Sequence, residues 1–69
     1  MILLHKLSHD REPFHLNPDL IERLDASPDC HVLLTTGTKI GVIETVEEVV
    51  ARIKAWRVDL LAESLRRAR

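Results

Sequence analysis

The sequence has few of the residues that usually stabilise very small proteins or carry their chemistry. Its 69 residues include one cysteine, so no internal disulfide can form, and no Cys/His spacing is of the zinc-finger type. Two glycines are too few for a glycine-rich phosphate-binding loop. No segment approaches the roughly 20 apolar residues that span a bilayer, and none has the form of a signal peptide. These absences predict a protein of the reducing cytoplasm without a transmembrane segment.

A chain of this length forms one domain, and such a domain buries only a modest fraction of its surface. Without disulfides or a structural metal, oligomerisation is the remaining way to add buried area. We therefore expect a homo-oligomer.

The charges are divided unevenly along the chain. Residues 1–51 carry four Lys or Arg against nine carboxylates, a net charge of −5, whereas residues 52–69 carry six against two, a net charge of +4. The protein therefore has an acidic body and a basic C-terminal end. This asymmetry bears on its partners rather than on its fold.

Extended segments and turns fill the first two thirds of the sequence. Asn17-Pro18-Asp19 is a strong turn signal, because Pro fixes φ and the Asn and Asp side chains bond nearby backbone. The segment 20–26 is short and has apolar residues at helical spacing, but we interpret it as a strand because it lies between turns. The expected strands are 2–7, 12–16, 20–26, 30–36 and 39–44.

The start of a C-terminal helix is clearly marked. Thr45 and Glu48 match the capping box, in which each side chain satisfies a free donor at the helix start. Apolar residues then recur at steps of three and four as far as Leu65, which indicates one apolar face. Glu48 with Arg52 and Glu63 with Arg67 are expected to pair at i,i+4. The sequence thus predicts an α+β fold: an antiparallel β-meander of four to five strands over about 1–44, then one helix over about 46–66.

The expected strands are apolar on both faces. Leu3, Leu33 and Ile43 alternate with apolar neighbours, whereas an exposed antiparallel sheet usually alternates apolar with polar residues. A single helix covers one face only. Either the sheet curves into a small barrel, or a second subunit covers the other face. We favour the second interpretation and take Leu33, Ile43 and Leu3 as candidate self-association residues.

No catalytic, cofactor or metal site is expected. The four histidines precede the helix without a converging set of carboxylates or thiols. Cys30 and His31 are neighbours in a strand, so they point to opposite faces and do not form a nucleophile with its base. The carboxylates are scattered, with no pair placed in contrasting environments. We therefore expect a binding protein rather than an enzyme.

Several segments resemble the FlbD family of small flagellar and swarming-motility proteins. They are Leu16-Asn17-Pro18-Asp19-Leu20-Ile21-Glu22, Ser27-Pro28-Asp29, the run from Leu33 to Ile40 and Val46-Glu47-Glu48-Val49. The similarity extends from Met1 to about Trp56. It differs at the first turn, where His9-Asp10 replaces the frequent Asn-Gly, and in the basic tail that continues to Arg69.

The resemblance implies a non-enzymatic accessory protein of the bacterial flagellum that supports motor output near the stator. It implies a cytoplasmic location, peripheral to the flagellar base and close to the inner membrane surface. Asn17 and Asp19 are candidate partner contacts, together with the basic residues Arg66, Arg67 and Arg69. An alternative is a small nucleic-acid-binding regulator that uses this basic helix end. The acidic body and the scarcity of aromatic residues disfavour the alternative.

Overall fold

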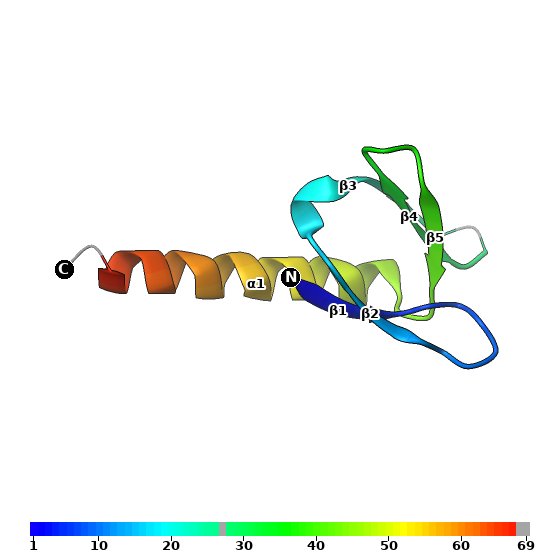
Figure 1. Ribbon diagram of the computed structural model, residues 1–69, viewed down its shortest axis with the longest axis horizontal. Helices are drawn as coiled ribbons and strands as arrows, with labels where there is room; N and C mark the ends of the chain where they lie inside the picture. The colour runs from blue at the N-terminus through cyan, green and yellow to red at the C-terminus, as the bar shows by residue number, and fades with distance from the viewer. Residues whose placement is uncertain (27, 68–69) are drawn as a thin grey trace.

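A computed structural model of the chain describes residues 1–26 and 28–67. It confirms the predicted α+β class, with strands followed by one C-terminal helix (Figure 1). The elements are β1 (Ile2–His5), β2 (Pro13–Leu16), the 3-10 helix η1 (Pro18–Leu20), β3 (Ile21–Asp25), β4 (Cys30–Leu34), β5 (Lys39–Val42) and α1 (Val46–Arg67). The ambiguous segment 20–26 is indeed mostly strand, and the helix ends one residue later than expected.

The strands form two antiparallel sheets that continue into one another. β1 pairs with β2, and β3, β4 and β5 form the second sheet. A bridge between Lys6 and Val42 joins them. Beside it, the N–H of Leu7 donates to the carbonyl of Gly41 at 2.9 Å and the N–H of Ile43 to that of His5 at 3.0 Å. β1 therefore lies next to β5, so the chain folds back on itself and its first strand meets its last.

The core lies between the inner face of these strands and the first half of α1. The four most deeply buried side chains come from four different elements. They are Leu4 of β1, Val32 of β4, Val42 of β5 and Val49 of α1. Ile2, Leu16 and Cys30 complete the buried apolar cluster. Because side chains alternate along a strand, Leu3 points away from the core while Leu4 enters it.

Local signals account for the turns. The Asn17 side chain accepts a hydrogen bond from the N–H of Asp19 at 3.1 Å and so caps η1. Gly37 has a φ of +91°, which glycine adopts without steric cost, in the loop that joins β4 to β5. At the helix start, the N–H of Glu48 donates to Oγ1 of Thr45 at 3.1 Å, which confirms the predicted cap.

The helix is longer than the sheets can cover. Its 22 residues span about 33 Å, whereas strands of four or five residues span roughly 13–17 Å. Its first half packs on the core through Val49, Ile53 and Trp56, and its second half extends past the sheets (Figure 1). The single apolar face that we predicted is thus buried over the first half only, and at 100° per residue Leu60 continues it whereas Leu61 and Leu65 lie roughly 120° and 160° around the helix from Val49. Leu60, Leu61 and Leu65 are 53%, 62% and 61% exposed.

Candidate functional site

A buried carboxylate joins the helix to the sheets. Glu44 lies between β5 and α1 and its side chain is only 4% exposed. Its Oε1 accepts from the N–H of His5 at 2.9 Å, and its Oε2 lies 2.7 Å from Nδ1 of the same histidine. Nη1 of Arg52 lies 3.0 Å from that Oε2 and donates to the carbonyl of Leu3 at 2.8 Å. Glu44, His5 and Arg52 thus connect the edge of β1 to the first turns of α1, and we call them the junction.

The junction keeps Glu44 ionised. Burial by itself raises the pKa of this carboxyl, but the hydrogen bonds from the backbone and side chain of His5 and from Arg52 outweigh it and lower the pKa from 4.5 to about 2. Arg52 therefore pairs with Glu44, and the predicted i,i+4 pair with Glu48 does not form in the described part of the chain. The other predicted helix pair, Glu63 with Arg67, is confirmed at 2.7 Å.

The low pKa of Glu44 predicts how stability changes with pH. A carboxylate whose pKa is lowered on folding stabilises the protein fully above its ordinary pKa of 4.5, and this contribution is lost as the pH falls towards 2. The difference between the two pKa values corresponds to about 3 kcal/mol. Urea unfolding followed by Trp56 fluorescence across this pH range measures it. Glu44→Gln is expected to reduce the slope of the free energy of unfolding against pH. An unchanged slope would contradict the role of Glu44.

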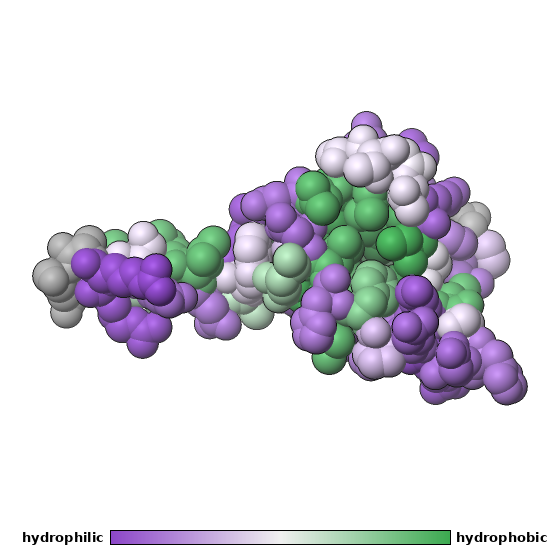
Figure 2. All heavy atoms as spheres, in the orientation of Figure 1, coloured by the Kyte–Doolittle hydropathy of each residue, from purple (hydrophilic) through white to green (hydrophobic). Residues whose placement is uncertain are grey.

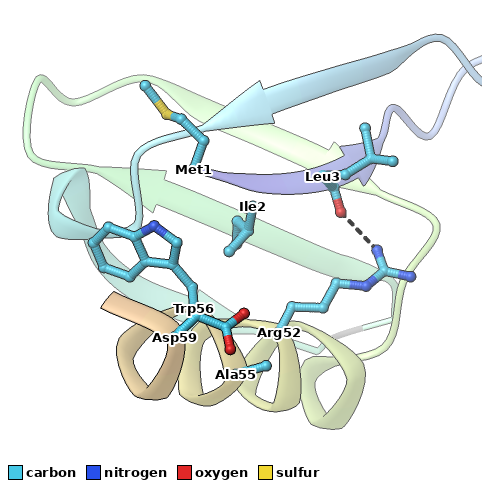
Figure 3. A pocket seen from close by; sticks show the side chains of 7 residues that line it. All are labelled: Met1, Ile2, Leu3, Arg52, Ala55, Trp56 and Asp59. Carbon is cyan, nitrogen blue, oxygen red and sulfur yellow. Dashed lines mark hydrogen bonds between the residues drawn. The ribbon is translucent and has the colours of Figure 1, made fainter. Parts of the chain in front are cut away.

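A groove lies beside the junction, between the start of β1 and the helix (Figure 3). Its volume is about 380 Å³. The residues that line it are Met1, Ile2, Leu3, Arg52, Ala55, Trp56 and Asp59. The lining is mostly apolar, and the side chains of Arg52 and Asp59 are its charged groups. Arg52 belongs to both features, so the junction also fixes one wall of the groove.

The turn with the candidate contacts Asn17 and Asp19 lies next to the same helix. Asp19 forms an exposed ion pair with Arg57, with Oδ1 and Nη2 3.4 Å apart. The guanidinium carbon of Arg57 lies 5.8 Å from the centre of the Trp56 ring, within the range of a cation–π contact. Asn17 is half-buried and its side chain is used to cap η1. Asp19 is therefore the more accessible of the two residues.

The candidate self-association residues occupy different places. Leu3 and Ile43 are 41% and 40% exposed, and Leu33 is half-buried. Leu3 lines the groove, whereas Leu33 lies opposite Lys39 in the pairing of β4 with β5. Of the predicted basic contacts, Arg66 and Arg67 are exposed at the end of α1, and Arg69 lies outside the described residues.

The pattern of the sequence does not predict the junction. Glu44 and His5 are 39 residues apart, and Leu3 and Arg52 are 49 apart, so no local spacing links them. The one available signal was a carboxylate placed directly between an apolar strand and a helix cap.

The described residues contain no group of three His, Cys, Asp or Glu side chains able to hold a metal ion.

Comparison with known proteins identifies the family. Within residues 1–26 and 28–67, none of the helices combines the length and the apolar character that a membrane-spanning segment needs. No curated protein and no solved structure matches the chain. The family model FlbD, described as flagellar and swarming motility proteins, matches residues 1–61, which confirms the resemblance found in the turn and helix motifs. The chain therefore belongs to the FlbD family of flagellar and swarming motility proteins.

Proposed function

We propose that this protein is a non-enzymatic accessory factor of the flagellar motor, which binds a motor protein, the stator in particular, at the cytoplasmic side of the flagellar base. The observation that carries the proposal is the match of residues 1–61 to the family of flagellar and swarming motility proteins. The matched residues include every residue that lines the groove. The groove is accordingly the surface that we assign to the partner.

The lining of the groove defines the chemistry of that partner. Ile2 and Trp56 form an apolar floor, the carbonyl of Leu3 faces Arg52, and Arg52 and Asp59 place opposite charges around it (Figure 3). A protein segment that inserts an apolar side chain, with an acidic group towards Arg52 and a basic group towards Asp59, complements this lining. Arg52 still has N–H groups for such a contact, since a guanidinium carries five and the two bonds to Glu44 and Leu3 both use Nη1.

A binding role also agrees with the state of the buried carboxylate. Glu44 is enclosed by His5 and Arg52, and its lowered pKa makes it a poor proton donor or acceptor near neutral pH. We therefore assign the junction a structural role, in which it holds the wall of the groove in place.

Deletion and a groove variant test this function in cells. We expect deletion to leave flagellar filaments present while swimming speed and swarming decrease, because the protein acts on motor output. Ala55→Arg fills the groove from an exposed helix position and is expected to reproduce the deletion phenotype. Ala51→Arg is the matched control, since Ala51 is exposed one turn earlier and does not line the groove.

Two results would contradict the proposal. Loss of all filaments on deletion would indicate a role in flagellar assembly or regulation instead. Normal swarming with Ala55→Arg, at normal protein level, would remove the groove as the partner site. Crosslinking of the wild-type protein in flagellated cells, read by mass spectrometry and repeated with both variants, identifies the protein that occupies the groove.

A further inference from the structure

The strand β1 has two edges, and one of them is only partly covered. The first edge pairs with β2 along the whole strand. The second meets β5 only towards its end, where the carbonyl of His5 accepts from the N–H of Ile43 at 3.0 Å and the N–H of Leu7 donates to Gly41 at 2.9 Å. After Glu44 the chain turns into α1, so no strand of the described residues lies beside the first half of β1 on this side.

The backbone groups of Leu3 point to this second edge. Residues two apart on a strand direct their N–H and C=O groups to the same side, and both groups of His5 bond at the second edge. Pro13, which lies opposite His5 in the pairing with β2, has no N–H to offer it, and this agrees with that direction. The carbonyl of Leu3 accordingly accepts from Arg52. The N–H of Leu3 therefore points away from β2, towards the groove.

Two side chains take the place of a neighbouring strand along this edge. Oε1 of Glu44 accepts from the N–H of His5 at 2.9 Å, as a backbone carbonyl would. Nη1 of Arg52 donates to the carbonyl of Leu3 at 2.8 Å, as a backbone N–H would. The next group along the edge is the N–H of Leu3, for which residues 1–26 and 28–67 supply no acceptor. An open donor at a strand edge is a template for a further extended segment.

The opposite wall of the groove is one stripe of α1. Arg52, Ala55, Trp56 and Asp59 lie within about 100° of one another around the helix axis. The volume of about 380 Å³ is at the lower end of the range for ligand pockets, which suits a short extended stretch rather than a helix. Figure 2 shows that apolar side chains gather over the strands, whereas polar ones cover the tip of the hairpin between β1 and β2.

The charges of the groove favour a basic residue in that stretch. Arg52 is paired with the buried Glu44, so its charge is balanced within the protein. Asp59 is exposed and takes part in none of the ion pairs formed among the described residues. Residues 1–51 carry a net charge of −5. A lysine or arginine beside Asp59 complements these charges, and an anionic partner such as a nucleic acid does not.

We propose that the groove binds its partner as an extended protein segment, which adds to the open edge of β1 and places a basic residue beside Asp59. A backbone carbonyl of the segment accepts the hydrogen bond from the N–H of Leu3, and an apolar side chain rests on Ile2 and Trp56. This mode of binding rests on the proposed function, in which the groove is the partner site. It adds the conformation and the charge of what binds there.

Leu3→Pro tests the backbone contact in cells. It removes the N–H at the groove and leaves the hydrogen bonds between β1 and β2 in place, since proline is tolerated at a strand edge. Leu3→Ala keeps the N–H, so the difference between the two variants reports the backbone contact. We expect Leu3→Pro to reduce swarming as far as Ala55→Arg does, and well beyond Leu3→Ala. Circular dichroism and urea unfolding establish that the variants keep the fold.

The same experiment separates this inference from the proposed function. Leu3→Pro that swarms as well as Leu3→Ala, while Ala55→Arg does not swarm, would overturn the extended segment and leave the groove as the partner site. Normal swarming with all three variants, at normal protein level, would contradict the proposed function as well.

A blocked peptide, acetyl-Thr-Val-Lys-Val-Thr-amide, tests the chemistry on the isolated full chain. We expect millimolar peptide to shift the NMR signals of the Leu3 amide and the Trp56 indole in a saturable way, and the same peptide with Glu in place of Lys to bind several-fold more weakly. Asp59→Lys should reverse this preference. Asp10→Lys, the same change at the exposed tip of the hairpin, is the matched control and should keep it.

Three results with the peptide would overturn the inference, and they hold even where Leu3→Pro fails to fold. An unchanged Leu3 amide signal at saturation of the Trp56 signal, or no binding at all, would remove the added strand. Equal binding of the Lys and Glu peptides would remove the basic residue. A reversal of preference in Asp10→Lys as large as in Asp59→Lys would show that net charge, rather than the groove, selects the peptide.

Discussion

Glu44→Ala is expected to lower the free energy of unfolding by about 2–3 kcal/mol at neutral pH, a large part of the stability of a domain of this size. The change removes the acceptor for the N–H of His5 and the counter-ion of Arg52. Breaking a fully buried ion pair costs about 3–5 kcal/mol, but here His5 and Arg52 are 33% and 38% exposed, so water partly replaces the lost contacts. Urea unfolding followed by Trp56 fluorescence measures the loss.

Glu47→Ala serves as the control for Glu44→Ala. Glu47 lies in the first turn of α1 and is exposed, so its removal costs only the interaction with the helix dipole, about 0.3–1 kcal/mol. Equal losses for the two variants would show that the junction contributes nothing specific. A Glu44→Ala protein that stays folded but binds its partner poorly would further show that the junction holds Arg52 in the wall of the groove.

Leu4→Ala should be the most damaging truncation in the strands, at about 2–5 kcal/mol, because Leu4 is fully buried and a cavity remains where its side chain packed. Its neighbour Leu3 provides an unusually close comparison, since it is the same residue type in the same strand and is 41% exposed. Leu3→Ala is expected to cost less than about 1 kcal/mol. Thermal and urea unfolding of both variants measure the difference.

The comparison of Leu3 with Leu4 also tests the strand register. A shift of one residue in the pairing of β1 with β2 would move every side chain of β1 to the other face. Leu3→Ala would then be the more damaging change. A large effect of both truncations in the same experiment would indicate that a second copy of the chain covers Leu3 in the purified protein.

Local chemistry in the sequence determined the elements of the fold. The Thr45 and Glu48 cap set the start of α1, and Asn17 and Pro18 set the turn before β3, because these signals act between residues close together in the chain. Alternation likewise separated Leu4 from Leu3. The predicted fold class and most element positions followed from these features, with strand ends shifted by one or two residues.

Only the tertiary structure decided how these elements meet. It placed β1 beside β5 and enclosed Glu44 between His5 and Arg52, contacts that depend on residues tens of positions apart and leave no periodic trace in the sequence. It also divided the apolar face of α1. Helical spacing shows that Leu61 and Leu65 are on one side of α1, but only the packing shows that Val49, Ile53 and Trp56, on another side, are the residues that meet the sheets, so Leu61 and Leu65 stay exposed in the described part of the chain. The sequence by itself therefore determined an α+β protein with a strong helix, and the tertiary structure decided which of its apolar surfaces remain open to other molecules.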